Sequence, residues 1–449
     1  MGRAANAGPP SRGSAPAFKG IVALDEQAES AACNGRFDNL NAMAEYESLS
    51  EAHRVGPMDS GGVGTRSRWS FGKKAGRPTQ AASDGLGVRE TVYLNGKFTA
   101  QHMTGTQRVA VCLVRELDCV LAQSSNPPRV VLLCPPNGQA PEFRHIEVRH
   151  TGAANISLFT WEQCWLPMMV RGRPLLNLGG TAPLFGRNRV CILHDAAVFD
   201  CPQAYTLPFR VWYRLLFRVL SRRAGSVYTV SDFSSTQLTR HLGVRPGRIE
   251  VLNNGSGHLK EVVPEPEALA RLGLVPQRYW LAVGGASINK NMSLLRRAFE
   301  RLDPSSDAKL VIVGGLNSHV FGEQPAVALS GDSRVVVAGP VSDATLKSLY
   351  LSATALVFPS LYEGCGLPPL EAMQCGCPVL ASTAASIPET CGDAAVYFDP
   401  TSVDSLVEAM QRLEGDAALR AELVRAGLAR VELFDWRSSV EQVYEQLAS

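Results

Sequence analysis

Short apolar runs alternate with longer stretches of helical spacing along the chain from about residue 92 onward. Buried parallel strands have apolar runs of this length, and covering helices account for the longer stretches. The runs lie at residues 92–94, 130–134, 156–159, 175–178, 190–193, 227–230 and 249–252, and again at residues 280–283, 310–313, 335–338, 355–358, 379–381 and 395–398. This alternation predicts an α/β protein with doubly wound parallel sheets in two Rossmann-like domains.

The first 87 residues have a different pattern, with clusters of Gly, Ala, Ser and Pro at residues 2–17 and 61–87. Segments of this composition cannot bury enough apolar surface to offset the entropy of the chain. We therefore expect a largely disordered extension over residues 1–87, a first domain over residues 88–262 and a second domain over residues 263–449.

Composition and charge agree with a globular protein of two domains. The 449 residues are 45% hydrophobic and 19% charged, and the net charge of +2 gives no general attraction to nucleic acid. The eleven Cys residues form no Cys-x-x-Cys pair, so we expect them to pack in the interior. No signal-type segment follows Met1 and no apolar run approaches the roughly 20 residues of a membrane span, which predicts a cytoplasmic location.

The most informative polar segment is residues 363–371, which follows a short apolar run of strand type. Gly364 and Gly366 allow the backbone to turn sharply and to approach a ligand closely. The two prolines that come next suit only the first turn of a helix, because neither can donate a backbone N–H. The pattern therefore predicts a strand, a glycine turn, and a helix that starts near residue 368 and ends near residue 376.

Glu363 lies in this turn and Glu371 in the first turns of the helix. The free N–H groups at a helix start attract anions, so a diphosphate can dock there. Carboxylates repel phosphate, and their natural partners are hydroxyl groups, which a sugar and a ribose supply. The arrangement predicts a nucleotide-sugar site, while the simpler interpretation is that both acids only favour the helix dipole.

The segment from Pro359 to Val379 resembles the Glu-x7-Glu signature of the retaining family 4 glycosyltransferases, and the likeness extends from about Val92 to the C-terminus. It includes Leu94 to Gly96, Thr104 to Arg108, His194-Asp195, Val230 to Ser234, Asn254-Gly255, Val283 to Gly285, Lys290-Asn291, Ser382 to Glu389 and Gly392 to Ala395. The resemblance implies the GT-B fold, with a cleft between two facing Rossmann-like domains. It places the donor in the C-terminal domain and the acceptor in the N-terminal domain, and implies that the last helix, at residues 436–447, crosses back.

The resemblance also assigns roles to individual residues. His194 and Glu363 are the candidate catalytic residues, since His194 would contact the donor sugar and Glu363 would position its hydroxyl groups. The candidate donor-binding residues are Gly285, Lys290, Gly364, Cys365, Gly366, Leu367 and Glu371, with Lys290 on the diphosphate and Glu371 on the ribose. Gly105 and Arg108 form the candidate acceptor or phosphate loop.

One departure from the family pattern is Asn289, because many relatives carry Arg immediately before the Lys of the diphosphate loop. Lys acts as a point charge for phosphate, whereas Arg adds bidentate geometry. The positive charge at the phosphates is therefore halved unless Arg108 or another base substitutes.

The chain contains no Asp-x-Asp motif of the metal-dependent glycosyltransferases, so we expect neither a metal nor another cofactor. The implied reaction transfers a hexose, with mannose as the candidate sugar, to a saccharide or lipid-linked acceptor in polysaccharide or envelope glycan synthesis. Two carboxylates suggest a covalent intermediate, while the family implies front-face attack within an ion pair. A noncatalytic sugar-nucleotide-binding assembly partner and a GT-B epimerase are the alternatives.

A basic stripe marks the predicted helix at residues 208–223, where Arg210, Arg214, Arg218 and Arg222 recur at four-residue spacing beside apolar and aromatic side chains. One interpretation is attraction to anionic lipid head groups, which would hold the protein peripherally at the inner face of a membrane. The other is a helix packed on a domain core with a solvated Arg face. We favour the second, because the apolar side fits a core equally well.

Overall fold

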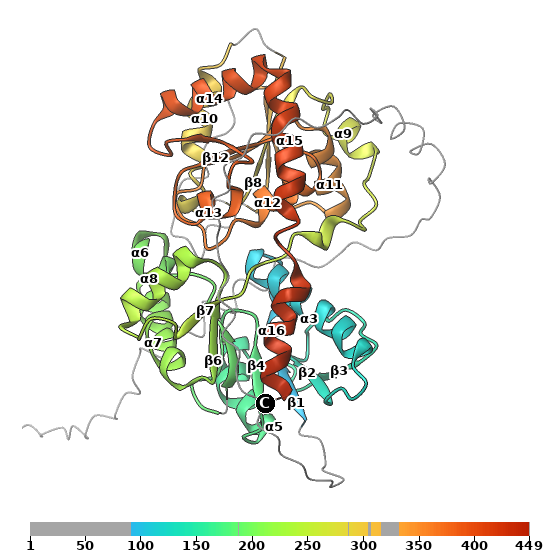
Figure 1. Ribbon diagram of the computed structural model, residues 1–449, viewed down its shortest axis with the longest axis vertical. Coiled ribbons are helices and arrows are strands. Elements are labelled where there is room, and N and C mark those ends of the chain that lie inside the picture. The colour runs from blue at the N-terminus through green and yellow to red at the C-terminus, as the bar shows by residue number, and fades with distance from the viewer. Residues whose placement is uncertain (1–90, 187, 286, 304–306, 316–331, 449) are drawn as a thin grey trace, which may run out of the picture. The chain divides into compact units, whose positions relative to one another are not determined.

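The computed structural model of the chain describes residues 91–186, 188–285, 287–303, 307–315 and 332–448. Within these residues the strands form two separate sheets, and every strand pair in each sheet is parallel (Figure 1). The predicted α/β architecture with two Rossmann-like sheets is confirmed. The extension over residues 1–87 lies outside the described residues, and the predicted domain boundaries stay predictions.

The first sheet has the strand order β3-β2-β1-β4-β5-β6-β7. Its strands are β1 (Val92–Asn95), β2 (Val130–Cys134), β3 (Ile146–His150), β4 (Leu175–Asn177), β5 (Asn188–Ile192), β6 (Ser226–Thr229) and β7 (Ile249–Val251). The connecting helices and turns are η2 (Lys97–Ala100), α3 (Gly105–Gln123), α4 (Leu158–Thr160), η3 (Trp161–Trp165), α5 (Leu166–Val170), α6 (Ala197–Asp200), η4 (Pro202–Ala204), α7 (Leu207–Arg223) and α8 (Asp232–Leu242). The central strands are buried along their length, as their apolar runs predict.

The second sheet has the order β10-β9-β8-β11-β12-β13. Its strands are β8 (Tyr279–Val283), β9 (Lys309–Val313), β10 (Val335–Gly339), β11 (Ala355–Phe358), β12 (Val379–Ser382) and β13 (Val396–Phe398). The helices and turns around it are η5 (Gly257–Leu259), α9 (Glu267–Arg271), η6 (Ile288–Lys290), α10 (Met292–Glu300), α11 (Asp343–Ser352), α12 (Leu367–Gln374), α13 (Ile387–Cys391), α14 (Val403–Gly415) and α15 (Ala417–Val431). In the first sheet the strands after β1 are added on one side of it up to β3 and on the other side from β4 onward, and β8 has the same position in the second sheet. The strand order therefore reverses beside β1 and beside β8, which creates a topological switch point at the carboxyl ends of the central strands.

One predicted strand is wrong. Residues 156–159 form no strand, because the Ser157 hydroxyl accepts a hydrogen bond from the Thr160 N–H at 3.1 Å and caps the short helix α4. The strand at this place in the chain is β3, Ile146–His150, which lies at the edge of the sheet. Only its first residue is buried, so its sequence Ile-Glu-Val-Arg-His lacks the continuous apolar run of the central strands.

The last helix, α16 (Trp436–Ala448), leaves α15 and lies against α3 of the first sheet, as the resemblance implied (Figure 1). The Tyr444 hydroxyl donates to the Ser124 hydroxyl at 2.9 Å, and Arg437 donates to the Gln123 side chain at 2.6 Å. The C-terminal segment therefore ties both sheets together.

Membrane-spanning helices and clustered metal ligands are both missing from the described residues. No helix in this part of the chain is long and apolar enough to cross a bilayer. The same residues contain no group of three or more His, Cys, Asp or Glu side chains that could hold a metal ion.

Candidate active site

The turn that carries the two predicted carboxylates connects β11 to α12. Gly366 has a φ of +89° and precedes the first helical residue, so the turn needs a left-handed residue there. The helix spans Leu367–Gln374, which confirms the predicted start at the prolines. The strand, glycine turn and helix therefore follow one another as the sequence indicated.

Hydroxyl groups hold the carbonyl oxygens of this turn. The Ser386 hydroxyl donates to the Glu363 carbonyl at 2.9 Å, and the Thr390 hydroxyl donates to the Cys365 carbonyl. Both donors come from the loop and helix after β12. Because its carbonyls are bonded on the protein side, the turn is fixed before any ligand binds.

The Gly364 carbonyl is held from the other sheet. The Ser231 hydroxyl donates to it at 2.5 Å and the Ser234 hydroxyl at 3.2 Å, and both residues belong to the start of α8. A side chain at position 364 would also meet the His194 carbonyl oxygen at 2.9 Å. Only glycine therefore allows the turn of the second sheet to pack against the backbone of the first.

Lys290 and Glu363 form an ion pair at the carboxyl ends of β8 and β11. The distance between Lys290 Nζ and Glu363 Oε1 is 2.6 Å, and the ammonium lies 5.5 Å from the centre of the Phe358 ring. Both side chains are mostly shielded from solvent. An ammonium has three N–H donors, so Lys290 retains donors for a phosphate while it stays paired with Glu363.

Glycines line the backbone beside Lys290. A Cβ at Gly285 would lie 3.2 Å from the Gly315 carbonyl oxygen, and one at Gly314 would collide with the Gly284 carbonyl. The loops after β8 and β9 thus pack backbone against backbone, at a separation that a side chain at either glycine would increase. Asn289 is buried, and its carbonyl accepts the Leu361 N–H at 2.7 Å.

Glu371 is buried and holds two protein partners. Its Oε1 accepts from His258 Nε2 at 3.0 Å and its Oε2 from the Tyr350 hydroxyl at 2.9 Å. Burial acts to raise the pKa of Glu371, but the His258 and Tyr350 hydrogen bonds and the charge of Arg108 outweigh it and lower the pKa. The carboxylate is therefore ionised, and each oxygen keeps a second lone pair that a ribose hydroxyl can use.

His194 and Asp195 follow the end of β5 in the first sheet. Burial lowers the pKa of His194 to about 4, against the opposing effect of a hydrogen bond to the Leu178 backbone. Nε2 is shielded and has no hydrogen-bond partner within the described residues, so the bond to Leu178 involves Nδ1. The ring is thus neutral at pH 7, with a proton on Nδ1 and a lone pair on Nε2.

Asp195 has the opposite shift. Burial raises its pKa to about 6, the charge of Glu363 adds to this rise, and the hydrogen bond from the Ala197 N–H works against it. That N–H lies 2.8 Å from Asp195 Oδ1. Asp195 therefore orients the start of α6, and its charge is held close to Glu363.

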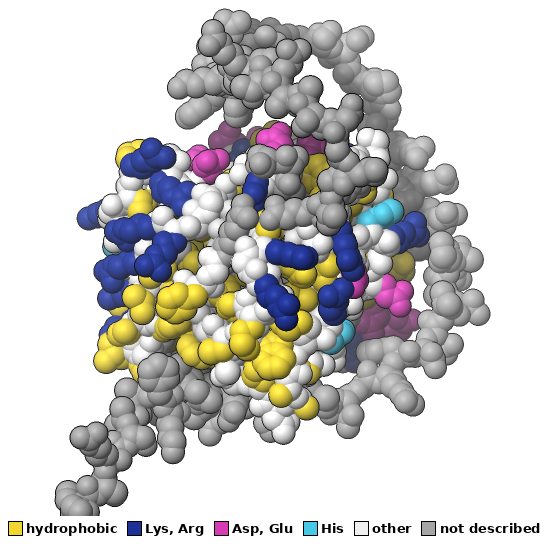
Figure 2. Space-filling view, turned by 90° about the horizontal axis from the view of Figure 1, so that it is seen from below, with side chains coloured by type: hydrophobic (Ala, Val, Ile, Leu, Met, Phe, Trp, Pro, Cys, Tyr) yellow, Lys and Arg dark blue, Asp and Glu magenta, His cyan; other side chains and the backbone are white. Residues whose placement is uncertain are grey.

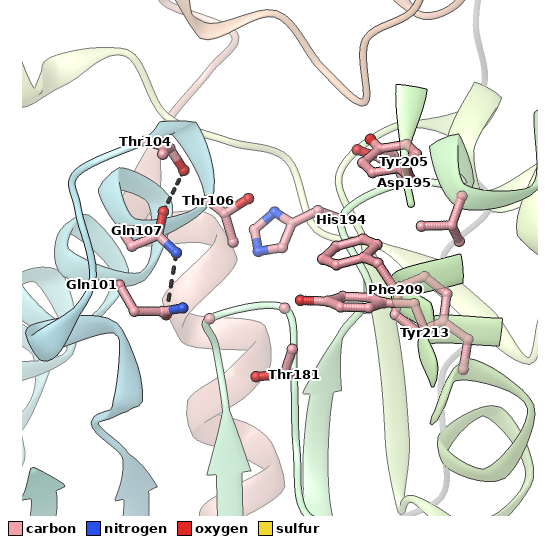
Figure 3. A pocket seen from close by; sticks show the side chains of 14 residues that line it. Gln101, Thr104, Thr106, Gln107, Thr181, His194, Asp195, Tyr205, Phe209 and Tyr213 are labelled. Atoms are coloured by element: carbon pink, nitrogen blue, oxygen red, sulfur yellow. Dashed lines mark hydrogen bonds between the residues drawn. The ribbon is translucent and has the colours of Figure 1, made fainter. Parts of the chain in front are cut away.

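His194 also borders a cavity of about 180 Å³ in the first sheet, which Figure 3 shows from close by. One wall is polar and includes Gln101, Thr106, Gln107 and Thr181, while the other is aromatic and includes Tyr205, Phe209, Tyr213 and Phe217. The His194 ring lies between the two walls (Figure 3). The Phe209 and Tyr213 rings stack with centroids 4.1 Å apart, so the aromatic wall is rigid.

The structure assigns a partner to Arg108. Its guanidinium makes two hydrogen bonds to the carboxylate of Asp343 on α11, at 2.5 and 2.6 Å. This ion pair joins α3 of the first sheet to a helix of the second. Contact between Arg108 and a phosphate stays a prediction. Gly105 begins α3, and a Cβ there would lie 3.9 Å from Leu367 Cδ1, so these two candidate residues are close together.

Glu162, which the sequence patterns did not indicate, is buried in the π-helical turn η3. Its Oε1 accepts from the Thr181 hydroxyl at 2.6 Å and from Asn95 Nδ2 at 2.9 Å, and its Oε2 pairs with Lys97 at 3.3 Å. Because Thr181 lines the cavity, Glu162 fixes part of the polar wall. The only sequence signal was a carboxylate between two tryptophans, Trp161 and Trp165.

Comparison with known proteins identifies this arrangement. The profile for "Glycosyltransferase Family 4" matches residues 128–256, and the profile for "Glycosyl transferases group 1" matches residues 267–430. O-antigen chain mannosyltransferase B of Escherichia coli is 32% identical over 265 residues, which cover 56% of this chain and 68% of that protein. The chain belongs to the family 4 glycosyltransferases. A second relative of this glycosyltransferase is O-antigen chain mannosyltransferase RfbU of Salmonella typhimurium, 29% identical over 52% of this chain and 63% of that protein.

Solved structures resemble the glycosyltransferase in fold. Sucrose-phosphate synthase from Thermosynechococcus elongatus aligns with a TM-score of 0.63 at 21% identity, over 80% of this chain and 100% of that one. HepE from Anabaena, in complex with UDP and glucose, aligns with a TM-score of 0.61 at 19% identity over the same shares. The two parallel sheets are therefore those of the GT-B fold, as the sequence predicted.

Proposed function

We propose that this glycosyltransferase moves a hexose, with mannose as the favoured sugar, from a nucleotide donor to a saccharide or lipid-linked acceptor. The setting that we favour is polysaccharide or envelope glycan synthesis, because two of its relatives are O-antigen chain mannosyltransferases. The observation that carries the proposal is the Lys290–Glu363 pair at 2.6 Å beside a glycine turn that packs on His194. The positive charge of Lys290 can bind a diphosphate there, and the Glu363 carboxylate beside it can accept hydrogen bonds from sugar hydroxyls.

In the proposed complex the donor diphosphate lies between Lys290 and the N-terminus of α12. The ammonium and the free N–H groups at the helix start neutralise the charge that develops on the leaving group. Glu371 binds the ribose, and Glu363 orients hydroxyl groups of the transferred sugar. The lone pair on His194 Nε2 accepts a hydrogen bond from one further sugar hydroxyl, since the ring is neutral at pH 7.

The transfer that we propose proceeds with retention at the anomeric carbon. The bond from that carbon to the phosphate oxygen breaks, and the new bond to the acceptor oxygen forms on the same face. The proton of the acceptor hydroxyl passes to the departing phosphate oxygen. Electrostatic stabilisation by Lys290 and by the α12 N-terminus replaces a divalent metal in this scheme.

We place the reacting end of the acceptor in the cavity beside His194. The polar wall offers hydroxyl and amide groups, and the aromatic wall offers apolar surface, which together match the two kinds of surface on a sugar ring. At about 180 Å³ the cavity is smaller than the roughly 300–1,000 Å³ of pockets for larger ligands, so it suits a single ring. A lipid-linked acceptor would bring the enzyme to the inner face of a membrane.

The test is release of free nucleoside diphosphate from UDP-, GDP- and ADP-linked hexoses, with EDTA present. One donor should be hydrolysed slowly without an acceptor, and Glu363→Ala should abolish its turnover. Loss of turnover in EDTA would refute metal independence, and donor binding without turnover for any sugar and acceptor would indicate a noncatalytic binder. The anomeric configuration of the product, measured by NMR, decides between retention and inversion.

A further inference from the structure

The outer face of α7 is apolar as well as the inner one. Leu207, Val211 and Leu215 recur every four residues and are 63%, 59% and 46% exposed. Positions four apart lie on the same side of a helix, so these three side chains form one outward stripe. The inner side is supplied by other residues, including the buried Leu216, Phe217 and Leu220. Packing in the core therefore does not explain the outward stripe.

Further exposed apolar side chains lie in the segments that connect to α7 through α4 and η3. The rings of Phe159 and Trp212 meet edge to face with centroids 4.9 Å apart, which joins α4 to α7. The Leu184 N–H donates to the Gln163 side chain at 3.0 Å, which holds the loop before β5 against η3. Met168 and Met169 on α5 and Phe185 in that loop are exposed, Phe185 by 70%. We define the α7 face by its six exposed apolar residues, Met168, Met169, Phe185, Leu207, Val211 and Leu215.

The described residues of the segments that carry the α7 face include exposed arginines and no exposed acidic side chain. Arg171, Arg173, Arg218, Arg222 and Arg223 are exposed. Among the described residues of segments 158–173, 184–189 and 207–223, Glu162 is the one carboxylate, and it is buried. Seen from the α5 end of the molecule, hydrophobic and basic side chains gather on the surface, with acidic ones near its margins (Figure 2).

Three arginines of the predicted basic stripe have structural partners, and one of them is Arg222, which donates to the Leu242 carbonyl at 2.7 Å and the Arg218 carbonyl at 2.9 Å. Arg210 donates to the Pro202 carbonyl at 3.2 Å, and Arg214 donates to the Val198 carbonyl at 3.0 and 3.1 Å. The favoured sequence interpretation, a helix packed on a core, thus accounts for part of the stripe. It does not account for Arg218, Arg223 or the outward apolar residues.

We propose that the α7 face docks on the surface of an anionic phospholipid bilayer. Apolar side chains enter the acyl boundary while flanking arginines contact anionic head groups, which is the arrangement of interfacial protein surfaces. A second copy of the chain is a poorer occupant, because a two-fold contact would place the same arginines against one another. The inference locates the membrane contact of the proposed function, but it does not depend on which sugar is transferred.

The experiment is co-sedimentation of the full chain with vesicles. We expect binding to vesicles that contain phosphatidylglycerol, much weaker binding to vesicles of phosphatidylcholine alone, and loss of binding as salt is raised. Each arginine close to an anionic surface contributes about fivefold to binding, so Arg218→Ser/Arg223→Ser should weaken it by about 25-fold. Val211→Ser/Leu215→Ser should weaken it by about tenfold or more.

The matched controls carry the same changes at exposed positions of the second sheet's helices. Arg412→Ser/Arg425→Ser removes two exposed arginines from α14 and α15, and Leu428→Ser/Leu433→Ser removes two exposed leucines from α15 and the turn after it. Both controls should bind vesicles like the native chain. All variants should keep native hydrolysis of the nucleotide sugar, which separates this inference from the proposed function.

Three outcomes would overturn the proposal. The native chain could fail to bind anionic vesicles, the α7-face variants could bind as well as the controls, or neutral vesicles could bind equally well. Self-association of the native chain that disappears only in the α7-face variants would instead assign this face to a contact between copies.

Discussion

Lys290 is the residue on which transfer should depend most directly. Lys290→Ala should lower kcat/KM about 10²- to 10³-fold, because a charge aimed at the leaving diphosphate is lost. Lys290→Arg should retain part of the activity, since the charge remains but its geometry changes. Lys309 lies at the start of β9 and donates to the Gly273 carbonyl at 2.6 Å, so Lys309→Ala is the control. Initial rates of nucleoside diphosphate release measure the effect, and native kcat/KM in Lys290→Ala would exclude the proposed role.

His194 and Asp195 should influence the pH dependence of stability in opposite directions. The pKa of His194 is depressed to about 4, so its unfolded form binds a proton that the native form refuses, and stability falls as pH drops from 6.5 toward 4. The pKa of Asp195 is raised to about 6, so the native form holds a proton that the unfolded form releases, and stability falls as pH rises from 3.8 to 6.

Thermal melts at pH 5 and pH 7.5 can separate these two effects. The difference in unfolding free energy between His194→Asn and the native chain should shift in favour of the variant from pH 7.5 to pH 5, by on the order of 2 kcal/mol. Asp195→Asn should show the reverse, with its relative stability greater at pH 7.5. Shifts of the same sign in both variants would mean that burial does not control the two ionisations.

Sequence patterns identified those candidate site residues that have a recognisable local motif around them. Lys290 follows a strand and a glycine pair, and Glu363 precedes a glycine turn, so local order alone marks both. Glu162 was not predicted as a site residue because its partners, Asn95 and Thr181, come from other parts of the chain. Arg108 was found as a cation, yet its carboxylate partner is 235 positions away and no local pattern predicts that pair.

Helices and strands were likewise predicted where their own sequence carries a continuous pattern. Central strands were predicted because burial on both faces demands continuous apolar runs. The edge strand Ile146–His150 was missed because one face is exposed and its sequence alternates. For α7 the sequence predicted the apolar inner side and the basic stripe, but it did not predict the apolar residues that face outward. Periodicity alone cannot show which of two apolar stripes on a helix is covered by the rest of the fold.

The docking of α16 gives an element-scale prediction. The Trp436 indole packs on Gly255, where an added Cβ would collide with the ring, whereas a Cβ at Gly257 would meet nothing within 4 Å. Gly255→Ala should therefore displace the start of α16 and destabilise the fold by about 1–3 kcal/mol, as overpacking does. Gly257→Ala is the control and should melt within a degree or two of the native chain. Equal melting temperatures for both variants would contradict the packing argument.

Hydrogen bonds and an ion pair connect the elements around the first sheet to those around the second. The Glu389 carboxylate accepts the Asp232 and Phe233 N–H groups at 2.7 and 3.0 Å and so caps α8. The Tyr362 hydroxyl donates to Asp200 at 2.9 Å. Together with Arg108–Asp343, these contacts link residues that are more than 150 positions apart. Their stabilising effect should therefore be lost when the two halves separate.

A double-mutant cycle on Arg108 and Asp343 tests this linkage. Each Ala substitution alone should destabilise the protein, and the double variant should be little worse than either, with a coupling of about 1 kcal/mol. The exposed Arg296–Glu300 pair within α10 should couple by only a few tenths of a kcal/mol. Chemical denaturation measures both cycles. Additive effects at Arg108 and Asp343 would show that the pair does not stabilise the folded chain.

The Gly364 carbonyl, bonded by two hydroxyls from α8, has a thermodynamic consequence. The turn proposed to hold the donor is bonded through this atom to the domain proposed to hold the acceptor, so we expect occupancy at one site to change affinity at the other. Reciprocity then requires that any factor by which acceptor tightens donor binding equals the factor by which donor tightens acceptor binding. We expect each substrate to tighten the binding of the other, so that attack by water on the donor stays slow until the acceptor is bound.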